Sequence, residues 1–174
     1  MLIIADCFPF LEELVTPYIA RTVSRCTGIS DEGICEVLRC CKIRHLNLAH
    51  SFIEGKLLGL NFEIPKLEVL NLSHTNINDE TLNVISKNCR GLLQLLLEQC
   101  NYYVTEKGVK HVGENCLQLR EINLKGCLKV DHDVVASLVF SRPSLRKITA
   151  PSKGTLLASR MSCLLVFQNY SSEV

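Results

Sequence analysis

The sequence predicts an α/β solenoid, with short parallel strands in one layer and short helices in the other. Three observations predict it: a leucine-rich segment recurs along the chain, its copies are about 25 residues apart, and an amphipathic stretch follows each copy. Leucine-rich repeats have this length and composition, and they stack so that neighbours bury each other's apolar surface. We therefore expect a horseshoe with strands on its concave face and helices on its convex face.

Five aligned segments give the predicted strands. They begin at residues 43, 67, 92, 119 and 145 and read IRHLNL, LEVLNL, LLQLLL, LREINL and LRKITA. A weaker sixth copy, YIARTV, begins at residue 18. Because successive side chains of a strand face opposite sides, we expect the leucines to point into the core and the residues between them to point outward.

A small or polar residue follows each strand at a fixed distance, at Cys26, Ser51, Thr75, Cys100 and Cys127. Acid-rich helix starts come next, and the predicted helical stretches are 31–41, 79–89, 106–116 and 131–143. Ser30, Asn78 and Thr105 are the candidate N-caps, since a hydroxyl or amide oxygen there accepts from a free backbone N–H. The repeat at 43–66 departs from the pattern and has a weaker helix.

The chain contains ten cysteines, but their spacing does not suit zinc or a disulfide framework. There is no CxxC pair, and no cysteine pair precedes a histidine pair at zinc-finger distance. Most of the cysteines instead fall at fixed repeat positions, where a small apolar residue with a weak S–H donor suits a tight internal corner. We expect structural thiols.

Composition narrows the function and the compartment. The formal net charge is +1, which argues against general affinity for nucleic acid or an anionic membrane. The apolar runs are shorter than the roughly 20 residues that a bilayer requires, and the N-terminus lacks the basic region and cleavage site of a signal peptide. The sequence thus predicts no nucleic-acid or membrane partner and a cytoplasmic or nuclear location.

Three regions are expected along the chain. Residues 1–17 form a partial repeat and an irregular junction, residues 18–150 form a leucine-rich-repeat domain of five to six repeats, and residues 151–174 form a C-terminal cap or irregular tail. ADCFPFLEEL, at residues 5–14, matches the end of a helix and the start of a strand. We expect the junction itself at residues 12–20.

The sequence offers no constellation that favours catalysis. Cys100 and Cys127 have no histidine at a suitable local position to serve as a base. His50 and His74 occupy equivalent loops of neighbouring repeats, so we expect them close in space, as solvated residues rather than a metal site. There is no phosphate-binding glycine loop and no GxSxG motif. We predict a protein that is not an enzyme, without catalytic residues, cofactor or metal.

The repeat consensus resembles that of a known family. LxxLxLxxC, followed by an acidic helix start and a helix ending in NC, is similar to the cysteine-containing repeats of F-box/LRR proteins, in a style close to the plant members. The clearest copies are LLQLLLEQCNYYVTEKGVKHVGENC and LREINLKGCLKVDHDVV, and the resemblance covers about residues 18–150.

The resemblance implies the substrate-recognition part of an SCF-type E3 ubiquitin ligase receptor, acting in ubiquitin-dependent protein degradation. We find no F-box in this chain, so an SCF adaptor is an expected partner only if an F-box lies upstream. The alternatives are a scaffold or inhibitor unconnected with ubiquitin, or a truncated fragment that lacks ligase recruitment.

Partner binding is expected on the concave face, where a substrate protein would lie. Its lightly charged, mixed surface suits a protein or peptide, and Val69 and Leu96 on neighbouring strands could form a small apolar anchor. The candidate binding residues are His45, Asn47, Val69, Asn71, Gln94, Leu96, Glu98, Glu121, Asn123 and Lys125.

Overall fold

The computed structural model describes residues 11–15, 31–51, 61–101 and 103–151. Within them the strands form a single six-stranded sheet whose order follows the chain, and every neighbouring pair is parallel. The strands are β1 (Glu13–Val15), β2 (His45–Asn47), β3 (Val69–Asn71), β4 (Gln94–Leu96), β5 (Glu121–Asn123) and β6 (Lys147–Thr149). The five aligned segments of the sequence therefore contain β2 to β6, as predicted.

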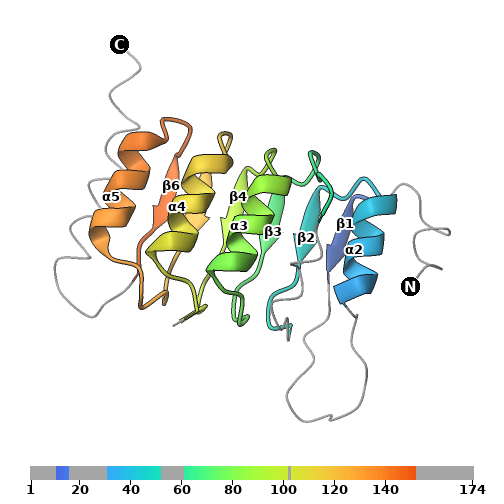
Figure 1. The fold of residues 1–174 in the computed structure, drawn as a ribbon, viewed down its shortest axis with the longest axis horizontal. Coiled ribbons are helices and arrows are strands. Elements are labelled where there is room, and N and C mark those ends of the chain that lie inside the picture. The colour runs from blue at the N-terminus through green and yellow to red at the C-terminus, as the bar shows by residue number, and fades with distance from the viewer. Residues whose placement is uncertain (1–10, 16–30, 52–60, 102, 152–174) are drawn as a thin grey trace, which may run out of the picture.

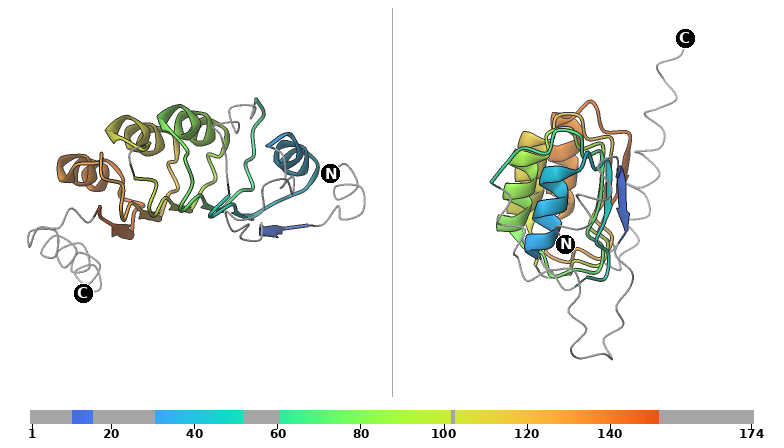
Figure 2. Two further views of the ribbon diagram at one scale, coloured as in Figure 1. Left: turned by 90° about the horizontal axis from the view of Figure 1, so that it is seen from below. Right: turned by 90° about the vertical axis from the view of Figure 1, so that its right-hand side faces the viewer.

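Helices cover one side of this sheet (Figures 1 and 2). The described residues contain α2 (Asp31–Cys40), α3 (Asp79–Asn88), α4 (Glu106–Asn115) and α5 (His132–Ser141). Each helix falls within a stretch predicted from the sequence, so the two-layer arrangement is confirmed. The curvature of a horseshoe stays a prediction. No helix in the described ranges combines the length and apolar composition needed to cross a bilayer.

One apolar core lies between the two layers. The middle residue of each central strand points into it: Leu46, Leu70, Leu95 and Ile122 are all 2% exposed or less. Apolar residues of α3 and α4 pack against it from the other side, among them Leu82 and Val112. The leucine spacing thus has the predicted cause, since each repeat buries one strand side chain and one helix face against its neighbours.

The N-terminal strand lies in the segment for which the sequence predicted the start of a strand. β1 pairs in parallel with β2, with Leu14 opposite Leu46, and it lies where the match of ADCFPFLEEL predicted the start of a strand. The physical reason is the spacing of Leu11 and Leu14, both of which pack against the core, in the manner of a repeat strand. YIARTV, Cys26 and Ser30 lie outside the described residues, as does the predicted tail from residue 152 onward.

The small residues after the strands bind backbone carbonyls inside the stack. The Thr75 hydroxyl donates to the Leu72 carbonyl at 2.6 Å. Cys100 and Cys127 are fully buried, and their thiols donate to the carbonyls of Leu72 and Leu97 in the preceding repeat, at 3.3 Å and 3.2 Å. These cysteines satisfy carbonyls between repeats, which explains the pattern without metal or disulfide chemistry.

Helix starts link neighbouring repeats. The predicted N-caps Asn78 and Thr105 are confirmed, because their side chains accept hydrogen bonds from the backbone N–H groups of Thr81 and Lys107. Asp79, in the first turn of α3, also accepts from the Thr105 backbone N–H at 2.8 Å and from its hydroxyl. The first turns of α3 and α4 are therefore hydrogen-bonded to each other.

Candidate functional site

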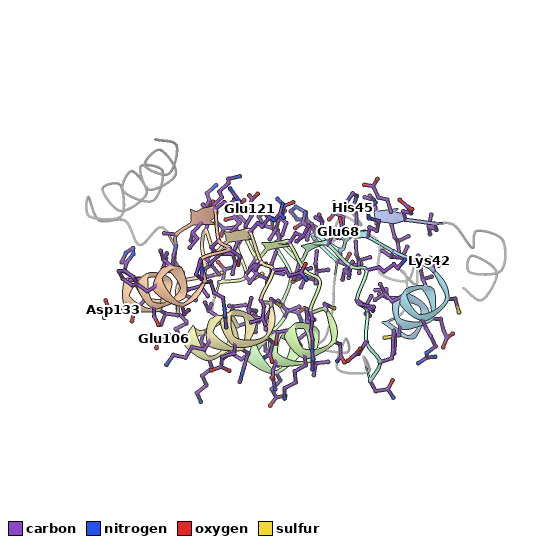
Figure 3. The ribbon with its side chains drawn as sticks, turned by 90° about the horizontal axis from the view of Figure 1, so that it is seen from above. Lys42, His45, Glu68, Glu106, Glu121 and Asp133 are labelled. Atoms are coloured by element: carbon purple, nitrogen blue, oxygen red, sulfur yellow. The ribbon has the colours of Figure 1, made fainter. Side chains whose placement is uncertain are left out.

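The sheet has one side that the helices leave uncovered, and we call its outward residues the open face. In each strand the first and third residues point this way and are exposed or half-buried. Figure 3 shows His45 and Glu121 on the strand side of the molecule, with Glu106 and Asp133 beside the helices. The open face consists of Glu13, Val15, His45, Asn47, Val69, Asn71, Gln94, Leu96, Glu121, Asn123, Lys147 and Thr149.

A hollow of about 320 Å³ lies on the open face across β1 to β4. This volume is at the lower end of the range for ligand pockets, which is about 300–1,000 Å³. Six of the predicted binding residues line it, together with Glu13 and Leu46. They are His45, Asn47, Val69, Asn71, Gln94 and Leu96. The structure therefore brings these six together and leaves Glu98, Glu121, Asn123 and Lys125 outside the hollow.

Val69 and Leu96 supply the apolar part of the hollow. Val69 lies opposite Gln94 in the register of β3 and β4, and Leu96 lies opposite Asn71. The two apolar side chains are therefore diagonal neighbours on adjacent strands, within reach of each other's packing. Both are half-buried, so each keeps apolar surface that a partner could cover.

The three asparagines of the open face also hold the chain as it leaves each strand. The Oδ1 atoms of Asn47, Asn71 and Asn123 each accept a hydrogen bond at 3.0 Å from the backbone N–H two residues on. Such Asx turns occupy the side-chain carbonyl. The three asparagines therefore have a structural role in addition to the partner contact that was predicted from the sequence.

The charged residues beyond the hollow pair with one another. Lys125 Nζ lies 2.8 Å from Glu98 Oε1, and Lys147 Nζ lies 2.6 Å from Glu121 Oε1. The Lys125 hydrogen bond lowers the pKa of Glu98, and Asn123 Nδ2 adds a hydrogen bond to the same carboxylate. Four predicted binding residues are thus members of cross-strand hydrogen bonds and ion pairs.

The N-terminal end of the open face has an acid that sequence reasoning missed. Arg44 binds Glu68 through two hydrogen bonds of 2.9 Å from Nη2 and lies 3.9 Å from Glu12. Glu13 is exposed and lines the hollow, and no ion pair among the described residues includes it. The LxxL spacing of Leu11 and Leu14, which places Glu13 between them, was the available signal.

His50 and His74 form a stacked pair beside the open face. Their ring centroids are 4.2 Å apart with an interplanar angle of 13°, which confirms the predicted proximity. Both residues have positive φ, 60° and 58°, and Gly126 adopts a positive φ in the equivalent turn two repeats after His74. Burial, and then the neighbouring His50, lower the pKa of His74. In the described part of the chain, no group of three or more metal-ligating side chains could hold an ion.

Known proteins resemble this chain in structure. No family model matches it. A leiomodin-1 fragment named for actin-binding site 2 superposes with a TM-score of 0.55 at 18% identity, covering 78% of this chain and 86% of that one. The tropomodulin C-terminal domain of Caenorhabditis elegans gives a TM-score of 0.51 at 16% identity, covering 96% and 89%. At these identities the likeness concerns the fold alone, which is an α/β fold with a parallel six-stranded sheet and leucine-rich-repeat-like neighbours.

Proposed function

We propose that this chain is a protein-binding module that holds its partner on the open face. The observation that carries the proposal is the hollow, where apolar Val69 and Leu96 lie among the polar side chains of His45 and Gln94. Protein interfaces combine an apolar centre with a polar surround in this way. The paired charges of Glu98, Lys125, Glu121 and Lys147 would surround that centre.

The proposal assigns binding and no catalysis. Cys127 and Cys100 are fully buried and hydrogen-bonded to carbonyls. Burial raises the pKa of Cys127 to about 12, so almost no reactive thiolate forms near neutral pH. The balanced net charge of +1 favours a protein partner over a polyanion.

We further propose that the bound protein is the substrate of an SCF-type ubiquitin ligase, in the cytoplasm or nucleus. The support is the resemblance of the repeats to those of F-box/LRR proteins, including the cysteine corners at Cys100 and Cys127. Actin is the first alternative partner, because the leiomodin-1 fragment is named for actin binding. A scaffold unconnected with ubiquitin is the other alternative.

Site-specific photocross-linking tests the binding face. A benzoylphenylalanine at Gln94, on the open face, is compared with one at Lys110, an exposed residue of α4. We expect discrete protein adducts from the Gln94 position only, lost when Leu96→Asp is added and kept when Phe140→Asp is added. Phe140 is 84% exposed on α5, so the control makes a similar apolar-to-acidic change on the helix side. Adducts from Lys110 alone, or from neither position, would contradict the proposal.

Partner identity is tested on the same material. A ligase receptor would give two results. The SCF adaptor would co-purify with the protein expressed from its own gene, including any residues upstream of this chain, and the cross-linked partner would accumulate in cells that express Leu96→Asp. Adducts to purified actin in the absence of the adaptor would replace that assignment with the actin alternative. If neither the adaptor nor actin is recovered while adducts still form at Gln94, the scaffold assignment remains.

A further inference from the structure

The hollow differs from the rest of the open face because it contains an acid, Glu13, that has no ion pair among the described residues. Beyond it, Glu98 and Glu121 are neutralised by Lys125 and Lys147. No ion pair or side-chain hydrogen bond that the structure records among the described residues involves Glu13, and the hollow also exposes the apolar surface of Val69 and Leu96. A partner can therefore gain both charge pairing and apolar burial at the hollow, whereas beyond it Glu98 and Glu121 are already paired with lysines.

Acids outnumber lysines and arginines among the described residues in or immediately before β1, β2 and β3. Glu13 begins β1, and Glu12 and Glu68 immediately precede β1 and β3. Arg44, which immediately precedes β2, lies within ion-pair distance of Glu12 and Glu68. Arg44 is already shared by Glu12 and Glu68. His45 faces Glu13 across the register of β1 and β2. Of the three acids Glu12, Glu13 and Glu68, only Glu13 has no lysine or arginine pair among the described residues. A basic side chain complements this corner.

The dimensions suit an extended chain that crosses the strands. The hollow spans β1 to β4, and three strand spacings amount to about 14 Å. An extended peptide rises about 3.3 Å per residue, so roughly four residues cover this distance. Alternate side chains of such a peptide face the sheet, which allows one to reach Val69 and Leu96 while another reaches Glu13.

We propose that the hollow binds an extended peptide segment in which an aliphatic residue packs on Val69 and Leu96 and a lysine or arginine, two or four positions away, pairs with Glu13. This inference rests on the proposed binding function and specifies the chemistry of the partner. It makes Leu96 the anchor and Glu13 the residue that selects charge.

Synthetic octapeptides test the selection directly. A glycine–serine octamer carries leucine at position three and lysine, glutamine or glutamate at position five or seven, and its affinity for the full chain is measured by fluorescence polarisation. The lysine peptide is expected to bind about two- to fivefold more tightly than the glutamine peptide, the range of an exposed ion pair. The glutamate peptide is expected to bind more weakly than both.

Three variants identify the residues responsible. Glu13→Lys reverses the order of the lysine and glutamate peptides, and Leu96→Asp weakens all of them by roughly tenfold or more. Glu114→Lys is the matched control, since Glu114 is an exposed acid on α4, 69% exposed at its side chain, and it leaves the order unchanged.

Either of two selectivity results would overturn the assignment: equal affinity for the three peptides, or a lysine preference that survives Glu13→Lys. Equal affinities that still fall with Leu96→Asp would remove the charge selection while the open face remains a binding surface. No binding by any peptide would also overturn the assignment, and cross-linking at Gln94 would then decide the proposed function separately.

Discussion

At the scale of single residues, the buried thiols are hydrogen-bond donors rather than reactive groups. Burial raises the pKa of Cys89, Cys116 and Cys127 to about 12, and the Cys127 thiol donates to the carbonyl of Leu97. Cys40, at the end of α2, is exposed. The chain therefore carries thiols of very different reactivity among the described residues.

Thiol labelling should separate these classes. Iodoacetamide at pH 8 is expected to modify Cys40 in the native protein and to leave Cys89, Cys116 and Cys127 unmodified, because a buried neutral thiol neither ionises nor meets the reagent. Peptide mass spectrometry reads each site, and labelling in urea shows that all four can react. Rapid modification of Cys127 in the native protein would refute this account of the repeat corners.

Alkaline pH should destabilise the fold. A cysteine thiol ordinarily has a pKa of 9.0, and burial raises the pKa of these three to about 12. Their contribution to stability is therefore complete below pH 9 and is lost as pH rises toward 12. Each thiol lowers the free energy of unfolding by up to about 1.4 kcal/mol per pH unit in this window. Urea unfolding at pH 8, 9 and 10 measures the slope, and Cys127→Ser should reduce it. An unchanged slope in that variant would contradict the assignment.

At the scale of elements, α3 and α4 approach closely because α4 has a glycine where they meet. A Cβ added to Gly108 would lie 2.5 Å from Asp79 Oδ1 and 2.8 Å from Leu82 Cδ1. Asp79 cannot easily move, since both its carboxylate oxygens accept hydrogen bonds from Thr105. Glycine is thus required by packing at a position where helix propensity alone favours alanine.

The variant Gly108→Ala tests which effect is larger. Helix propensity would stabilise the protein by about 1 kcal/mol, but the steric conflict with Asp79 and Leu82 costs about 1–3 kcal/mol, so we expect net destabilisation in urea unfolding. Gly113→Ala is the control: its Cβ would contact only the flexible end of Leu138, at 2.7 Å. A Gly108→Ala protein more stable than Gly113→Ala would show that the helices can separate at little cost.

Sequence patterns predicted the helices and most strands because each repeat contains residues that mark where its helix begins and ends. Asn78 and Thr105 mark the helix starts, and cysteines at Cys89 and Cys116 mark the ends. At the N-terminal end the sequence offered two neighbouring candidates for a strand: LEELV, which carries only the LxxL part of the consensus, and the weaker copy YIARTV that follows it. The local sequence pattern alone could not decide between these two segments. The structure shows that the first of them contains β1, which pairs with β2.

At the scale of the whole molecule, burial is deepest in the middle of the stack and falls toward its ends. Leu95 and Ile122 are 0% exposed, whereas the equivalent residues of β1 and β6, Leu14 and Ile148, are only partly buried. A repeat contacts only its neighbours, so a central strand has a partner on each side.

This gradient predicts unequal costs for the same truncation. Leu95→Ala should lower the free energy of unfolding by about 3 kcal/mol and Leu14→Ala by about 1 kcal/mol, because a fully buried leucine leaves a larger cavity. Urea unfolding measures both, and amide hydrogen exchange should show slower exchange in β3 to β5 than in β1. Equal losses for the two variants would mean that β1 is as well packed as the centre.

The candidate site was predictable in part. Strand alternation alone assigned His45, Val69 and Leu96 to one face, and the structure places them around one hollow. The extent of the hollow depends on which charges pair across strands, as Glu98 and Lys125 do, and on the asparagine turns. Those are relations between repeats, and the pattern within a single repeat does not contain them.

The order of the sheet has a consequence for biogenesis. Each strand pairs with the strand that precedes or follows it along the polypeptide, so the described sheet has no pairing that waits for a distant segment. Loop closure is then of similar, modest cost at every step. A nascent chain emerging from the ribosome could add one turn of the stack at a time, with each completed turn serving as the template for the next.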